Sequence, residues 1–396
     1  MSYKKKTLFA RGFKKKWPVS DHTYAFNTPI FETSNFIISS PAKANEIIAR
    51  GGNTYFEGDD YIYSRGGNPT QRVLEKSISM LEGTPDAITY SSGMAAITNL
   101  FLTVLESGDH VVCGDPVFGD TQYLFDKIGK KFGIECTFID TSNIKELKEN
   151  IQENTKLIFF ETPSNPNLSV TDIRLVSKLA KKNEIMVAVD NTMATPYLQN
   201  PFLLGADVVV HSLTKFLGGH SDSLGGAICT DKNLLSKLRQ TLFVTGSILD
   251  PFAAWNLSKG VKTLPIRIEQ QSKSALRIAK ELRKNPKIRK VYYPGLKSHS
   301  THQTAKKQMN GFGSIISFEL QKNDPKKVGI FVKNLNLFSF GVSFGGVESL
   351  VEYVPYLTHH KVTYKTESPM NLVRLSVGIE DEKDLLHDLE VSLEKI

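Results

Sequence analysis

Short, continuous apolar runs alternate with amphipathic stretches between about residues 69 and 230. The runs have the length of buried strands, and the stretches between them carry apolar residues at the spacing of a helix face. This alternation indicates a largely parallel sheet covered on both faces, with its chemistry at the carboxyl ends of the strands. The expected strands are Ala87–Tyr90, His110–Cys113, Thr137–Asp140, Leu157–Phe160, Ile185–Val189 and Asp207–His211, and the expected helices are Pro69–Glu82, Gly93–Leu105, Ile144–Ile151 and Thr171–Lys182.

The pattern changes after about residue 250. A long helical stretch covers residues 251–284 and contains Pro265, where we expect a kink or a break. The first sixty or so residues lack strong periodicity and resemble an extended arm. We therefore predict an α/β protein with an arm over residues 1–62, a large α/β domain over 63–255 and a smaller α+β domain over 256–396. In the last part, the expected strands are Lys290–Tyr293, Ile315–Phe318 and Val373–Ser376, and the expected helices are Pro325–Leu335 and Glu382–Glu394.

Composition narrows the class of protein. The 396 residues are 40% hydrophobic and 23% charged, which is ordinary for a globular protein, and no apolar run is long enough for a bilayer. Cys113, Cys136 and Cys229 are scattered without CxxC spacing, so we expect buried thiols in the cytoplasm. The formal charge of +8 comes from lysines mixed with acids, without a nucleic-acid-binding motif. We expect neither a membrane nor a nucleic acid as a partner.

A carboxylate and an amine follow two successive strands. Asp190 ends the first, and His211-Ser-Leu-Thr-Lys215 brings two hydroxyls and an ammonium to the end of the second. A buried carboxylate needs a cationic or hydrogen-bonded partner. A pyridoxal-phosphate (PLP) site needs a lysine for the Schiff base, hydroxyls for the phosphate and a carboxylate for the pyridine nitrogen. Alone, Asp190 is more readily explained as a turn residue; the two segments together favour a PLP site.

The segment Ser91-Ser-Gly-Met-Ala-Ala96 offers a cradle for the phosphate. It follows a strand and opens an apolar helix, so the amides of Gly93 and Met94 would point at an anion. A small-residue helix cap is the alternative explanation, and the nearby Lys215 favours the cradle. No metal site is expected, because His220, His359 and His360 have no carboxylate or cysteine partner at ligand spacing.

Seven segments along the chain carry motifs in a fixed order: Tyr61–Thr70, Ser92–Ala96, Glu161–Asn167, Val189–Thr192, His211–His220, Gly345–Leu350 and Leu375–Asp381. In order and spacing they resemble the motifs of the Cys/Met-metabolism PLP-dependent enzymes, the trans-sulfuration family. This family includes cystathionine γ-synthase, cystathionine γ-lyase, methionine γ-lyase and the homoserine-ester sulfhydrylases. The resemblance extends from about Tyr24 to the end and implies the aspartate-aminotransferase type of fold (fold type I), PLP as cofactor and an amino-acid substrate.

The resemblance also implies roles for single residues. Lys215 would form the Schiff base and carry protons, and Asp190 would pair with the pyridine nitrogen. The phosphate would be bound by Ser212, Thr214, Gly93 and Met94 of the same chain, and by Tyr63 and Arg65 of the neighbouring subunit. The substrate would be bound by Asn165, which contacts the ring oxygen or the carboxylate, by Arg374, which clamps the carboxylate, and by Ser343, which also orients Lys215. A homotetramer built from two dimers is the assembly that the resemblance implies.

Three features depart from the family pattern. Phe118 stands where a tyrosine is usual, so it can stack on the pyridine ring but offers no hydroxyl for proton transfer. Asp120 replaces the reactive cysteine of methionine γ-lyases, which argues against that activity. The segment Thr358–Met370 is shorter than usual, so the pocket rim there is expected to differ.

The motifs favour γ-replacement or γ-elimination on cystathionine or homoserine derivatives, as in cystathionine γ-synthase or γ-lyase. O-acyl-homoserine sulfhydrylation is the first alternative, since some enzymes of that type also have a phenylalanine at the position of Phe118. Methionine γ-lyase action is a weaker alternative. A β-lyase is disfavoured because the β-lyase branch of the family typically has a tryptophan after its tyrosine near the position of Ser343 and Phe344, and this chain does not. An alternative of another class is a catalytically silent binding protein with the same fold; Lys215, Asp190 and Arg374 together argue against it.

Overall fold

The structure is a computed structural model that describes residues 4–12, 18–20, 23–24, 26–49, 61–357 and 369–396. His359, His360 and most of the shortened segment Thr358–Met370 lie outside these ranges. Within them, no helix combines the length and apolar character that a membrane span requires.

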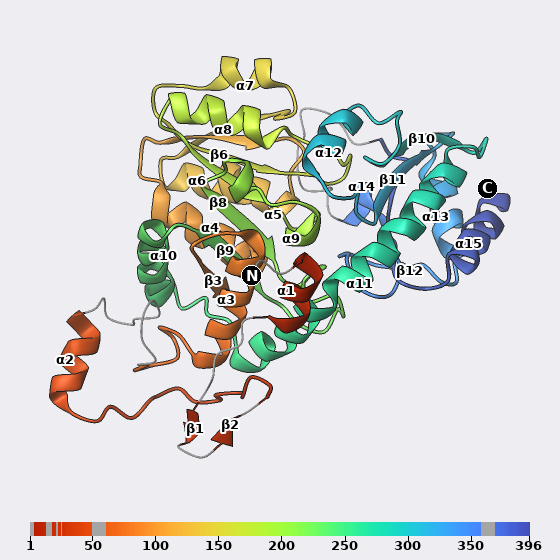
Figure 1. The fold of residues 1–396 in the computed structure, drawn as a ribbon. Coiled ribbons are helices and arrows are strands. Elements are labelled where there is room, and N and C mark those ends of the chain that lie inside the picture. Colours follow the sequence, from red (N-terminus) through yellow and green to blue (C-terminus); the bar gives the residue numbers. More distant parts are fainter. Residues whose placement is uncertain (1–3, 13–17, 21–22, 25, 50–60, 358–368) are drawn as a thin grey trace.

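A seven-stranded sheet forms the centre of the larger part of the molecule (Figure 1). Its strands follow the order β3-β9-β8-β7-β6-β4-β5, and only β9 runs antiparallel to its neighbours. The prediction of a largely parallel sheet is therefore confirmed, although β9 was not foreseen. The strands are β3 (Asp86–Tyr90), β4 (His110–Gly114), β5 (Glu135–Ile139), β6 (Thr155–Glu161), β7 (Met186–Asp190), β8 (Val208–Ser212) and β9 (Gly226–Thr230).

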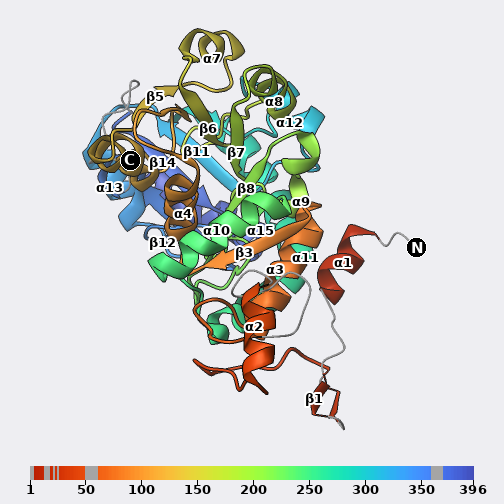
Figure 2. The ribbon, with the colours of Figure 1, turned by 90° about the vertical axis from the view of Figure 1, so that its left-hand side faces the viewer.

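Helices cover both faces of this sheet. Successive residues of β8 show this: Val208 and Val210 pack in a cluster with helices α4 and α10, whereas Val209 packs in a cluster with α3 and α11. Figures 1 and 2 show these layers from two sides. The helices of this part are α3 (Pro69–Glu82), α4 (Gly93–Val104), α5 (Gly119–Tyr123), η1 (Leu124–Ile128), α6 (Gly129–Lys131), α7 (Ile144–Asn150), α8 (Ile173–Lys182), α9 (Thr195–Leu198), η2 (Phe202–Leu204) and α10 (Lys232–Thr245).

A five-stranded sheet of order β10-β11-β14-β13-β12 forms the smaller part. The helix α11 (Pro251–Leu282) joins the two parts and continues through Pro265, so the prediction of a break there was wrong, whereas the alternative of a kink stays a prediction. The predicted boundary between residues 255 and 256 falls inside α11, and the division into domains stays a prediction. The remaining elements are β10 (Ile288–Tyr292), α12 (His302–Gln308), β11 (Ile315–Leu320), α13 (Pro325–Lys333), β12 (Ser339–Phe340), β13 (Leu350–Tyr353), α14 (Val354–Leu357), β14 (Leu372–Ser376) and α15 (Glu382–Glu394).

The amino-terminal region contains more regular structure than its weak periodicity suggested. Helix α1 (Lys5–Arg11) packs against α3 and α11 through the fully buried Phe9 (Figure 2). Strands β1 (Pro18–Ser20) and β2 (Thr23–Tyr24) and helix α2 (Pro41–Ala49) follow.

One tight contact positions the start of α4 against the sheet. A Cβ atom added to Gly226, in β9, would lie 2.0 Å from the backbone oxygen of Ser92 and 2.9 Å from the backbone nitrogen of Gly93. Only glycine fits here, because backbone atoms cannot swing aside as the end of a flexible side chain can.

We expect Gly226→Ala to lower the free energy of unfolding by about 2 kcal/mol or more, because the added methyl forces strand and helix apart. Gly329→Ala is the matched control: nothing lies within 4 Å of its added Cβ, so the better helix propensity of alanine should be neutral or stabilising by up to about 1 kcal/mol. Differential scanning calorimetry of the two variants measures the contrast. Equal melting temperatures would show that the Gly226 contact is not tight.

Candidate active site

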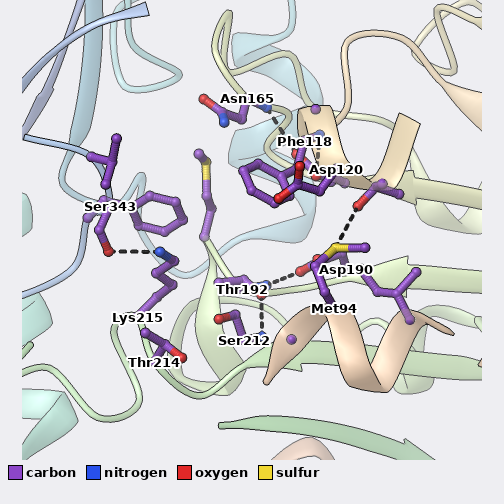
Figure 3. A pocket seen from close by; sticks show the side chains of 18 of the residues that line it. Met94, Phe118, Asp120, Asn165, Asp190, Thr192, Ser212, Thr214, Lys215 and Ser343 are labelled. Atoms are coloured by element: carbon purple, nitrogen blue, oxygen red, sulfur yellow. Dashed lines mark hydrogen bonds between the residues drawn. The ribbon is translucent and has the colours of Figure 1, made fainter. Parts of the chain in front are cut away.

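A cavity of about 540 Å³ lies where the carboxyl ends of the large sheet meet the small sheet (Figure 3). This volume suits a cofactor together with a small substrate. Every site residue predicted from the sequence lines it, except Tyr63 and Arg65. The predicted residues in its wall are Gly93, Met94, Phe118, Asn165, Asp190, Ser212, Thr214, Lys215, Ser343 and Arg374.

Lys215 lies in the turn after β8, and its amine points across the cavity to the smaller part of the molecule (Figure 3). Its Nζ donates a 2.7 Å hydrogen bond to Oγ of Ser343. Burial and the nearby Arg374 lower the pKa of Lys215 to about 8, against an opposing effect of Glu352. A large fraction of this amine is therefore neutral near pH 8, and only the neutral amine can act as a nucleophile or a base.

Asp190 ends β7 and lies at the floor of the cavity. The Thr192 amide donates a 2.9 Å hydrogen bond to its Oδ1. Burial raises the pKa of the Asp190 carboxyl, opposed by hydrogen bonds from Thr192 and by His211. A cationic pyridine ring would offset this cost of burial, so the residue suits the nitrogen end of PLP.

The start of α4 and the end of β8 approach closely enough to form an anion cradle. A Cβ atom on Gly93 would lie 2.9 Å from Cβ of Ser212, so a larger residue would close the space between them. Ser92 caps α4 by accepting from the amide of Ala95. Gly93 and Met94 come just before Ala95 in the first turn of α4. No carbonyl of the same helix can accept a hydrogen bond from their backbone amides. This cradle, with Ser212 and Thr214 beside it, fits a phosphate.

Arg374 is held in place before any substrate arrives. It is buried in β14, and its guanidinium donates 2.9 Å hydrogen bonds to Oδ1 of Asn165 and to the backbone oxygen of Ser343. It also pairs with the buried Glu352. A guanidinium fixed in this way is oriented for the planar carboxylate of an amino acid.

Glu161 is a cavity residue to which sequence reasoning gave no role. It ends β6, and its carboxylate accepts from the backbone amides of Phe118 (2.8 Å) and Asn165 (3.3 Å). Burial, followed by the charge of Asp190, raises the pKa of Glu161. The available signal was its place at the end of an apolar strand, the same signal that singled out Asp190.

Tyr63 and Arg65 do not reach the cavity of their own chain. The Arg65 guanidinium donates a 2.7 Å hydrogen bond to the backbone oxygen of Phe243 and lies 4.1 Å above the Phe243 ring. Tyr63 is 38% exposed. Their predicted part in a neighbouring subunit's site therefore stays a prediction.

The region of Phe118 forms one wall of the cavity. Phe118 immediately precedes α5, and Figure 3 shows it beside Asp120, which is solvent-exposed. Asp120 differs from the buried Glu161 and the half-buried Asp190, whose carboxylates accept hydrogen bonds. Among the described contacts its carboxylate has no hydrogen bond or ion pair, so this side chain can interact with a ligand that enters the cavity.

Comparison with known proteins decides the family. The model of the family described as "Cys/Met metabolism PLP-dependent enzyme" matches residues 11–394. This chain belongs to that family. The predicted fold class and the cofactor, PLP, are thereby confirmed, and the chain is an enzyme of sulfur amino-acid metabolism.

Relatives within the family carry different activities in their names. An L-methionine γ-lyase of Fusobacterium nucleatum subsp. polymorphum is 44% identical, over 93% of this chain and 93% of its own. A cystathionine β-lyase of Lactococcus lactis subsp. cremoris is 43% identical, over 94% and 95%. The structure of cystathionine γ-lyase from Lactobacillus plantarum, complexed with L-serine, matches with a TM-score of 0.89 and 36% identity, over 100% and 99%. Similarity therefore fixes the family and not the reaction.

The lowered pKa of Lys215 predicts how the cofactor-free enzyme takes up PLP. Because the neutral amine must attack, the rate constant should rise about tenfold per pH unit at low pH and level off above about pH 8. Free Nα-acetyl-lysine, with an ordinary side-chain pKa near about 10.4, is the control and should keep accelerating to higher pH. Stopped-flow absorbance measures both, and a rate that climbs steadily through pH 10 would contradict the prediction.

Proposed function

We propose that this family member performs γ-elimination or γ-replacement on cystathionine or homoserine-derived amino acids, as cystathionine γ-lyase or γ-synthase does. The observation that carries the Cα chemistry of the proposal is the chain of hydrogen bonds from Lys215 through Ser343 to Arg374, while the preference for the γ-position rests on the motifs of the sequence. The chain of hydrogen bonds places an amine with a lowered pKa beside a fixed guanidinium. An amino acid whose carboxylate is held by Arg374 therefore presents its Cα to Lys215.

PLP, when bound, supplies an electron sink that makes the Cα and Cβ protons of an amino acid acidic. The phosphate would be held by Gly93, Met94, Ser212 and Thr214, and the nitrogen by Asp190. Lys215 would hold the cofactor through its amine, and its Nζ, bonded to Ser343, would take the proton from Cα of the bound amino acid. Arg374 and Asn165 bind the carboxylate, and Ser343 accepts a hydrogen bond from the Lys215 amine so that it faces Cα.

The cavity wall formed by Phe118 and Asp120 influences which leaving group and which substrate the site accepts. A phenyl ring can cover the face of the cofactor but cannot protonate a departing sulfur or oxygen. Asp120 adds a negative charge to the same wall and favours a substrate whose far end carries an ammonium group, as cystathionine does. Methionine has no such group, which is why we place methionine γ-lyase action lower.

We also propose that the active unit is at least a dimer, within a homotetramer, in which Tyr63 and Arg65 reach the phosphate bound by the neighbouring subunit. Arg65 suits this role because a guanidinium binds phosphate in a bidentate manner. A cytoplasmic location fits the three free thiols, of which Cys113 and Cys229 are buried and Cys136, contrary to the expectation of burial, is only half-buried.

Product analysis tests the reaction. With L-cystathionine and water, γ-elimination should release cysteine, 2-oxobutanoate and ammonia, whereas β-elimination would release homocysteine, pyruvate and ammonia. L-Methionine tests for methanethiol, and an O-acyl-homoserine with cysteine or sulfide tests for replacement. Lys215→Ala should lower turnover by about 10³-fold or more while the protein still binds PLP, because Lys215 is the one lysine among the described residues that line the cavity. Homocysteine and pyruvate as the main products would refute the γ-specific proposal, and no product with any substrate would favour the binding protein.

Mixing variants tests the shared site. Lys215→Ala and Arg65→Ala should each be nearly inactive alone. If Arg65 serves the neighbouring subunit, unfolding and refolding them together should restore about a quarter of the sites, because half of the dimers are hybrids and each hybrid has one intact site. The control is Lys215→Ala refolded alone. Activity that stays absent in the mixture would mean that Arg65 serves its own chain or none.

A further inference from the structure

A buried ring of hydrogen bonds lies behind the cavity, at the ends of α3, β7 and β8. Glu82, the last residue of α3, accepts with its Oε1 from Nε2 of His211 (2.6 Å) and from Nδ2 of Asn191 (2.8 Å). The side chains of Glu82, His211 and Asn191 are fully buried. Oε2 of Glu82 accepts from Asn200 (3.2 Å), so its carboxylate has three donors in place of water.

The ring closes on the cavity side through Asp190. The amide of Ser212, next to His211, donates to Oγ1 of Thr192 (2.8 Å), and the Thr192 amide donates to Oδ1 of Asp190 (2.9 Å). Figure 3 shows these two bonds. Because Asn191 directly follows Asp190, Glu82 anchors both the backbone that carries Asp190 and the imidazole behind it.

We propose that Glu82 and His211 are positioning residues for Asp190, which hold its carboxylate in place and in its charged form opposite the nitrogen of PLP. A buried carboxylate without compensation takes up a proton and would then pair poorly with a pyridinium. His211, oriented by Glu82, places an imidazole close enough to Asp190 to favour the ionised carboxylate. This role goes beyond the proposed reaction and is independent of which substrate is used.

Other ionisable groups face the ring from neighbouring elements. Glu161 on β6 is close to Asp190 and opposes its ionisation, since each carboxylate repels the other. On the far side, the thiol of Cys229 on β9 and the amine of Lys5 on α1 lie close to Glu82. Lys5 donates to Oδ1 of Asn200 (2.6 Å), so α1 contributes to the anchoring from outside.

The test uses the PLP-loaded enzyme without substrate. Glu82→Gln and His211→Gln each remove one charged or ionisable member while keeping a similar shape. The positive charge on the pyridinium lowers the proton affinity of the nearby Schiff-base nitrogen. If Asp190 loses its support, this charge is weakened, so the pH midpoint of the visible absorption band should rise by about half a unit or more. The dissociation constant for PLP should rise roughly fivefold.

His110→Gln is the matched control, because His110 is also a buried histidine of the large sheet. It lies in β4, where its ring bonds to Thr155 and Thr137 and not to the cavity. We expect it to lower the melting temperature without moving the pH midpoint. A merely structural ring would give the same result for Glu82→Gln and His211→Gln, and that outcome would overturn the proposal.

A milder variant covers the case in which the buried substitutions do not fold. Asn200 is only half-buried, and Asn200→Ala removes one donor to Glu82. It should shift the midpoint in the same direction by a smaller amount. An unchanged midpoint in this variant would also count against the proposal. A wild-type protein with a normal PLP band but no turnover would refute the proposed reaction and leave this test intact.

Discussion

The hydrogen bond between Lys215 and Ser343 is the contact on which the site depends, because it joins the two parts of the molecule. Lys215 comes from the turn after the large sheet, and Ser343 comes from the segment before β13 of the small one. Ser343 adopts a φ of +84°, which is costly for a residue with a side chain and is maintained only where the surroundings impose it. The Arg374 guanidinium bonded to its carbonyl provides such surroundings.

Buried charge is the second constraint. Glu161, Asp190, Lys215, Arg374 and Glu352 lie close together at the cavity, and burial opposes the charged form of Asp190, Glu161, Lys215 and Arg374. Arg374 and Glu352 compensate each other. Asp190 has only hydrogen-bond donors and a more distant imidazole, which suits a group that pairs with a cofactor carrying its own positive charge.

Much of this arrangement could be predicted from the sequence because strand ends and polar residues coincide. The apolar runs before Asp190 and His211 indicated which residues meet at one edge of the sheet, and the resemblance to the family supplied Ser343 and Arg374. Strand β9 was missed because the pair Gly225-Gly226 is typical of a turn. In the structure Gly226 lies in the strand, where the close approach of Ser92 requires a glycine, and this contact is visible only in the folded chain. Glu82 was missed because a helix-terminal glutamate is ordinary, and its partners are remote in sequence. The unbroken α11 shows tertiary packing overriding the local effect of Pro265.

The continuity of α11 makes it a mechanical link between the two sheets. Arg267, two residues after Pro265, donates to the backbone oxygens of Gly260 in the same helix (2.7 Å) and of Phe216 in the turn that carries Lys215 (2.9 Å). Gly260 itself packs so closely on Gly218 that an added Cβ would lie 2.1 Å from its oxygen. The same continuous helix therefore packs on the base of Lys215 near its start and leads into the small sheet that carries Ser343 at its end. Through α11, the backbone that carries the amine and the backbone that carries its partner share one support.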